Sequence, residues 1–297
     1  MQHRDSFSSF HPLTNFLYFA LVLVCAMFLM HPASLLISLF SAIVYSVSLS
    51  GRRAVRFLLV WLLPTMLMAA ILNPAFNHEG VTILTYLPSG NPITLESILY
   101  GLAAAVMLAA VVCWFHCYSQ VMTSDKFVYL FGRVIPALSL VLSMALRFVP
   151  KFQKQFRAVR EAQLCIGRGD SDRFLQRMRN GATVLSIMVS WALENAIETA
   201  QSMRGRGYGL PGRTAFSIYR WEKRDQLLLL WLIFCGAALL VFRQMGGLYW
   251  RYFPSVGGTA ASALAVCGQL LYLALCLTPV ILNRWEDRAW KHSVSSS

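Results

Sequence analysis

Long apolar runs alternate with short polar connections along most of this chain. Six of the runs are of roughly 16 to 24 residues, and about 20 helical residues cross a hydrocarbon core of about 30 Å. They cover positions 13–30, 32–49, 57–72, 98–118, 226–242 and 259–282. The pattern therefore predicts an all-α, polytopic membrane protein with about six transmembrane helices. His31-Pro32 divides the first two runs and predicts a tight hairpin or a re-entrant segment there.

Composition agrees with this environment. Apolar residues make up 57% of the 297 positions, charged residues only 13%, and the mean hydropathy is +0.55. The net charge of +13 would point to nucleic acid in a soluble chain. Here the cations lie between apolar runs, where membrane topology and anionic lipid explain them, so we expect lipid contact and no nucleic-acid binding. The seven cysteines lie mostly inside apolar runs without CxxC spacing, so the pattern supports neither disulfides nor a thiolate metal site.

The positions of lysine and arginine predict the orientation. Arg52, Arg53 and Arg56 mark one side of the membrane, whereas the connection 73–97 has no basic residue. Because short cytosolic connections are enriched in lysine and arginine, the arginine-rich side should be cytosolic. Alternation along the six spans then places both termini inside.

One connection is far longer than the others and divides the chain into three parts. Residues 1–119 hold four predicted transmembrane helices, and residues 226–297 hold two more with a polar tail. Residues 120–225 between them carry 17 of the 26 basic residues and 8 acidic ones. This stretch is too long for a simple connector and helical in its pattern, so it predicts a packed cytoplasmic module.

Three helices are expected within the module. The first is apolar over 136–148, is bent or restarted at Pro150, and then places Phe152 and Phe156 opposite several cations before ending near Gly167. A short second helix is expected to end at Asn180-Gly181. A longer third helix should run from about position 183 to 203.

Two carboxylates lie four positions apart on this third helix, Glu194 and Glu198. Like charges at that spacing destabilise a helix by a few tenths of a kcal/mol unless cations form ion pairs with them. We expect Arg157 and Arg160 of the first long helix to form these ion pairs.

Both long helices run into an arginine framed by glycines. The two endings are Gly167-Arg168-Gly169 and Arg204-Gly205-Arg206-Gly207-Tyr208, with Arg168 and Arg206 38 positions apart. Glycine supplies the left-handed residue that ends a helix, and arginine presents a planar fork that pairs with carboxylates. Simple helix termination, with arginine stabilised at the negative end of the helix dipole, explains each ending alone. Together they indicate a shared docking role toward acidic pockets.

Other classes of protein find little support. Cys113, His116 and Cys117 lie about one helical turn apart without a nearby acid in the span, which favours a packed helix over a metal site. No phosphate-binding GxxxxGK loop and no catalytic constellation occurs, so an enzyme is disfavoured and any ATP hydrolysis must come from partners. The predicted spans contain no charged residue, which disfavours a self-contained permease for charged solutes. A permease subunit for apolar solutes and a pure scaffold stay as alternatives.

Several segments resemble one known family, the transmembrane T component of energy-coupling factor transporters, along nearly the whole chain. The segments are FHPLTNFLYFALVLV at 10–24, LSMALRFVPKF at 142–152, ENAIETAQSMRGRGYGLPGRT at 194–214, YRWEKRD at 219–225 and NRWEDRAW at 283–290. Each segment alone is weakly specific, but their order is specific. In that family two coupling helices end in Ala-Arg-Gly signatures, and glycine replaces alanine at both places here.

The resemblance implies a non-catalytic subunit of an ABC-type importer in the bacterial plasma membrane, active in the uptake of a vitamin or another micronutrient. It implies that Arg168 and Arg206, with Gly167, Gly169, Gly205, Gly207 and Tyr208 around them, dock into two ATPase subunits that carry ATP and Mg. Arg204 or Arg206 would make the main contact at the second ending. It also implies a separate substrate-binding membrane subunit (S component), which we expect to contact Met144, Phe148, Phe152 and Phe156. No cofactor or metal is expected in this chain.

Overall fold

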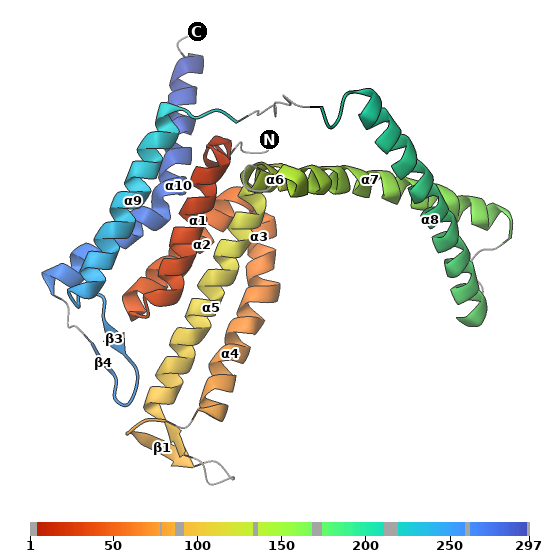
Figure 1. The fold of residues 1–297 in the computed structure, drawn as a ribbon. Coiled ribbons are helices and arrows are strands. Elements are labelled where there is room, and N and C mark those ends of the chain that lie inside the picture. The colour runs from red at the N-terminus through yellow and green to blue at the C-terminus, as the bar shows by residue number, and fades with distance from the viewer. Residues whose placement is uncertain are drawn as a thin grey trace. The chain divides into compact units, whose positions relative to one another are not determined.

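The computed structural model describes residues 5–77, 79–86, 92–132, 136–167, 174–210, 219–258 and 262–295. Most of these residues are helical (Figure 1). In chain order the elements are η1 (Phe7–Ser9), α1 (Pro12–Phe28), α2 (Pro32–Ser50), α3 (Arg52–Phe57), η2 (Leu58–Leu62), α4 (Leu63–Phe76), β1 (Ile83–Tyr86), β2 (Pro92–Thr94), α5 (Leu95–Val121), α6 (Ser124–Gly132), α7 (Pro136–Cys165), α8 (Phe174–Gly205), α9 (Lys223–Gln244), β3 (Trp250–Arg251), β4 (Gly257–Gly258) and α10 (Ala263–Ser295).

The apolar runs form the predicted helices. Among the described residues, five continuous helical stretches are long and apolar enough to cross a membrane: Pro32–Ser50, Arg52–Phe76, Leu95–Val121, Lys223–Gln244 and Ala263–Glu286. A sixth apolar helix, α1, has 17 residues. The prediction of an all-α polytopic membrane protein is thereby confirmed. The hairpin at His31-Pro32 is formed by a helix start, because the His31 ring accepts a hydrogen bond from the Ala33 amide (3.2 Å).

The chain forms two compact units. One contains Met1–Thr123 and Tyr219–Ser297, and the other is Ser124–Ile218. The first unit holds the apolar helices, and the second holds α6, α7 and α8.

The first unit packs around an aromatic centre. Helix α2 contacts α5 and α10, α4 contacts α5, and α9 contacts α1 and α10. Large side chains with less than 2% exposure fill the middle: Trp114, Tyr18, Tyr45, Tyr272, Phe7 and Phe19. The Trp114 indole donates a hydrogen bond to Ser38 Oγ (3.1 Å), which supplies the partner that a buried N–H requires. Aromatic packing and internal hydrogen bonds thus hold the bundle together.

Helices α4 and α5 run side by side in this unit (Figure 1), and Gly101 permits their close approach. A Cβ atom at Gly101 would lie 3.1 Å from the Asn73 and Pro74 side chains and 3.2 Å from the Ala70 carbonyl oxygen. The larger side chain of Gly101→Val would force the helices apart, at a cost of about 1 to 3 kcal/mol. Thermal unfolding of the purified protein in detergent should reveal a lower midpoint. An unchanged midpoint would mean that α4 moves freely against α5.

The second unit agrees with the prediction for its first long helix and differs for the other two. Helix α7 continues from Pro136 to Cys165 as one element, so Pro150 does not restart it. Asn180-Gly181 does not end a helix, because α8 continues from Phe174 to Gly205. The predicted short helix and the third helix are therefore one element. A Cβ at Gly181 would meet nothing within 4 Å, so this glycine lies at an open position of the helix surface and not at a turn.

Candidate functional site

Helix α8 ends in a defined left-handed turn. Gly207 has a φ of 80°, a conformation that residues with a side chain rarely adopt. The Tyr208 amide donates to the Met203 carbonyl (3.0 Å), and the Gly207 amide donates to the Arg204 carbonyl (3.0 Å). This pair of bonds is a Schellman motif, in which Arg206 is the last residue before the left-handed glycine. The position of Arg206 at the helix end is thus fixed by backbone geometry.

The glycine that ends this helix is Gly207 and not Gly205. The sequence left open an earlier end before Gly205, but that residue is still helical. Arg204 and Arg206 are both exposed. Within the described part of the chain, neither makes an ion pair within 4 Å. Two unpaired guanidinium groups are therefore presented at the end of α8.

Helix α7 also ends at a glycine with positive φ, but this glycine has a different position in the Gly-Arg-Gly motif. Gly167 has a φ of 76°, and its amide donates to the Leu164 carbonyl (3.0 Å). Here the left-handed glycine precedes the arginine, whereas in α8 it follows the arginine. The two endings match in sequence but not in backbone position. Arg168 and Gly169 themselves lie outside the described residues.

A contact between aromatic and polar side chains joins α7 to α8. The Phe152 and Trp191 rings meet edge to face with centroids 5.2 Å apart. Lys151 Nζ lies 5.4 Å from the centre of the Trp191 ring and donates a hydrogen bond to Asn195 Oδ1. Asn195 in turn donates to the Trp191 carbonyl (3.1 Å). This contact fixes the two helices against each other at their crossing.

The residues predicted to form ion pairs lie on these helices but do not meet. Arg157, Arg160, Glu194 and Glu198 are exposed, and no ion pair within 4 Å joins them in the described structure. Lys151, which the sequence reasoning did not single out, makes the cationic contact to α8 instead. The lysine and Trp191 could have been found from the apolar and cationic positions that face each other across the two helices.

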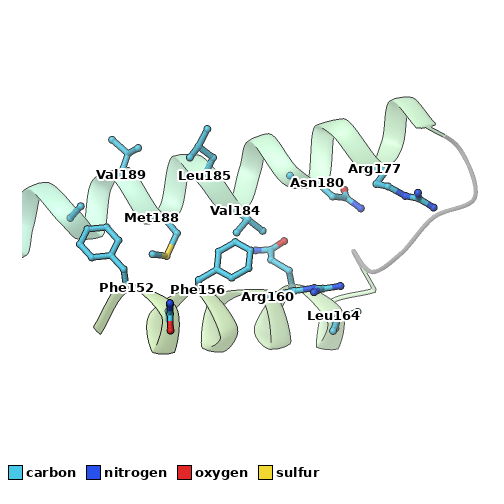
Figure 2. Close-up of a pocket in the computed structure, with 14 residues that line it drawn as sticks. Phe152, Phe156, Arg160, Leu164, Arg177, Asn180, Val184, Leu185, Met188 and Val189 are labelled. Atoms are coloured by element: carbon cyan, nitrogen blue, oxygen red, sulfur yellow. The ribbon is translucent and has the colours of Figure 1, made fainter. Parts of the chain in front are cut away.

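An open groove runs between α7 and α8 (Figure 2) and has a volume of about 670 Å³. Phe152 and Phe156 form part of one wall, and Val184, Leu185 and Met188 form part of the other. Met144 and Phe148, the other residues of the predicted partner contact, are partly buried and do not line the groove. The predicted contact surface therefore divides into two parts. The α8 wall was missed, although Val184 and Met188 are four positions apart on one helix face.

The Cys113-His116-Cys117 group has packing partners. Cys117 Sγ donates to the Ala42 carbonyl (3.8 Å), and the His116 ring stacks on Phe57 with centroids 4.3 Å apart. Among the described residues, no cluster of three or more His, Cys, Asp or Glu side chains is placed to bind a metal ion. These contacts give the cysteines and the histidine roles in helix packing.

Comparison with known proteins identifies one family and several relatives that match parts of the chain. A family model described as cobalt transport protein matches residues 5–218. The energy-coupling factor transporter transmembrane protein of Lactobacillus helveticus is 33% identical over 111 residues, which are 37% of this chain and 40% of that protein. The proteins of the same name from Bacillus selenitireducens and Thermotoga maritima are 33% identical over 112 residues and 30% identical over 118 residues.

The chain thus covers 40 to 42% of the length of these three relatives, and the matched segments are 37 to 39% of its own length. The family model covers far more of it and includes α7 and both helix ends. The six apolar helices agree with a membrane component of a transport system. The family model covers well over half of the chain, so the chain belongs to the cobalt transport protein family, and it is similar to transmembrane proteins of energy-coupling factor transporters.

Proposed function

We propose that this chain couples ATP hydrolysis in two partner ATPase subunits to the movement of a separate substrate-binding membrane subunit. The observation that carries this proposal is the end of α8, where a Schellman motif holds Arg204 and Arg206 at a fixed position, both exposed and without an ion pair among the described residues. A carboxylate on a partner would pair with such a guanidinium through two parallel hydrogen bonds.

Coupling of this kind requires stiff elements between the docking end and the membrane. Helices α7 and α8 have 30 and 32 residues and are joined by the Phe152–Trp191 contact and the Lys151–Asn195 hydrogen bond. A displacement at one end of a continuous helix is transmitted along its length. On this proposal Met144 and Phe148, with the outer faces of Phe152 and Phe156, contact the substrate-binding subunit. Arg157 forms an ion pair with Glu194 or Glu198 when the assembly forms.

In this account Arg168 and Arg206 dock into two separate ATPase pockets. Each single change to alanine should weaken coupling, and the double change should abolish it, because independent contacts add. The measurement is ATP-dependent uptake by vesicles that contain the assembled transporter. If uptake by the double variant equals uptake by one of the single variants, the idea of two separate pockets is refuted.

Two simple assays, with three possible outcomes, distinguish coupling from the alternative functions. Copurification of ATP-binding subunits with this chain supports the proposal. Flux of a solute through vesicles that contain the purified chain alone would support a permease instead. If neither copurification nor flux is observed, a scaffold or an enzyme is favoured.

A further inference from the structure

The groove between α7 and α8 exposes a large amount of apolar surface. Phe156 is 47% exposed, Leu185 is 65% exposed and Val189 is 51% exposed, and all three line it. In Figure 2 Phe156 faces α8, whereas the Leu185 and Val189 side chains lie on the side of α8 away from α7. Apolar area left in water costs roughly 25 cal/mol per Å², and contiguous exposed patches mark binding surfaces. A ligand with an apolar body would cover these side chains.

One end of the groove is cationic. Arg160 from α7 and Arg177 from α8 lie toward the same end, from opposite walls (Figure 2). Among the residues that the structure describes, no acidic side chain lines the groove. Neither arginine makes an ion pair within 4 Å in the described part of the chain. The groove is therefore complementary to a ligand that has an anionic group at one end of an apolar body.

We propose that the groove binds one anionic phospholipid, with its phosphate between Arg160 and Arg177 and an acyl chain along the apolar walls. Basic pockets at the cytoplasmic side of membrane proteins bind such headgroups, and the lysine and arginine counts predict that this module lies on that side.

This inference goes beyond the proposed coupling function. Met144 and Phe148 do not line the groove and stay available to a partner subunit. A lipid in the groove would support the inner sides of Phe152 and Phe156. The lipid would therefore fill the space between α7 and α8 and stabilise their arrangement.

The test is native mass spectrometry of the purified full chain, titrated with phosphatidylglycerol and with phosphatidylcholine. We expect phosphatidylglycerol to bind more tightly. The double variant R160Q/R177Q should lower its affinity at least about tenfold, because two charge-assisted contacts are lost. The matched control is K154Q/R179Q, which removes the same charge from the same helices outside the groove and should change affinity by no more than about twofold. Val184→Trp should also lower the affinity, because it fills the groove and keeps both arginines.

Each other outcome has a definite meaning. An equal loss in K154Q/R179Q would reduce the effect to general surface charge and overturn the proposal, as would an unchanged affinity in R160Q/R177Q. Displacement of the lipid by equimolar glycerol 3-phosphate would assign a free-phosphate site and overturn it, whereas failure to displace supports it. If R160Q/R177Q keeps its lipid affinity but loses a copurifying membrane protein, the groove is a protein-docking surface. Coupling assays do not enter this test, so its failure is distinct from failure of the proposed function.

Discussion

Changing Arg206 to alanine should weaken association with the ATPase subunits by tens of fold. The guanidinium is exposed at the end of α8 and is unpaired among the described residues, so it is available for charge-assisted contacts of roughly 1.5 to 3 kcal/mol each. Membrane insertion should not change, because the residue lies outside the apolar helices. The measurement is copurification of ATPase subunits with the tagged chain, quantified against its level in the membrane.

Arg179→Ala is the matched control, because it removes an exposed arginine from the same helix, far from the C-terminal end that carries Arg206. Its copurification should equal that of the unchanged chain. Arg204→Ala distinguishes the two arginines of the ending. Since Arg206 immediately precedes the left-handed Gly207, we expect the larger loss for Arg206. Normal copurification of Arg206→Ala would refute the docking role.

Changing Asp225 to alanine should destabilise the membrane unit strongly. Asp225 is 2% exposed at the start of α9, and its carboxylate accepts from the amides of His11 (2.8 Å) and Glu222 (3.0 Å). Loss of the carboxylate leaves two N–H groups without this partner, at about 1 to 3 kcal/mol each where they are buried. The apparent unfolding midpoint in detergent should fall by about 5 °C or more.

Asp225→Asn is the graded control, because it keeps one acceptor oxygen for His11 while its amide group cannot accept from Glu222. Its midpoint should lie between those of the unchanged chain and Asp225→Ala. The same region is held by the Trp221 ring, which stacks on His11 with centroids 4.1 Å apart. An Asp225→Ala midpoint equal to that of the unchanged chain would show that this stacking alone fixes the start of α9.

The membrane helices could be predicted because their signal is local. A run of apolar residues of sufficient length has one stable arrangement in lipid, so hydropathy and length identify it without knowledge of neighbours. The contacts between these helices could not be predicted. The Trp114–Ser38 hydrogen bond joins residues 76 positions apart, and the His11–Asp225 bond joins residues 214 positions apart. Long-range pairs of this kind leave no periodic trace in a single sequence.

The ends of the module helices were predicted with partial success. Glycine after arginine correctly indicated that α8 ends near Arg206, but glycine alone does not specify which residue adopts positive φ. Hydrogen bonding selects Gly207 over Gly205. Asn180-Gly181 has the composition of a helix end, yet α8 continues through it. The cost of about 1 kcal/mol for an internal glycine is small for a helix of 32 residues that is fixed to α7 where the two cross.

The docking arginines could be proposed from sequence because an arginine between glycines at a helix end is visible in the residue types alone and has the chemistry to pair with a carboxylate. The groove could not, because its two walls come from helices whose alignment depends on the Phe152–Trp191 contact. The four residues assigned to ion pairs from the sequence illustrate the difference. They are Arg157, Arg160, Glu194 and Glu198. Their charges and spacing were read correctly, but the distances between α7 and α8 are a property of tertiary packing. Their pairing stays a prediction for the assembled transporter.

The most direct test of the coupling account is a cryo-electron microscopy structure of the chain assembled with its ATPase subunits. The account predicts that the Arg206 guanidinium lies within hydrogen-bonding distance of an acidic side chain of an ATPase subunit, with Gly207 still in the left-handed conformation. Arg206 packed against its own chain, or facing the exterior of the cell, would contradict it.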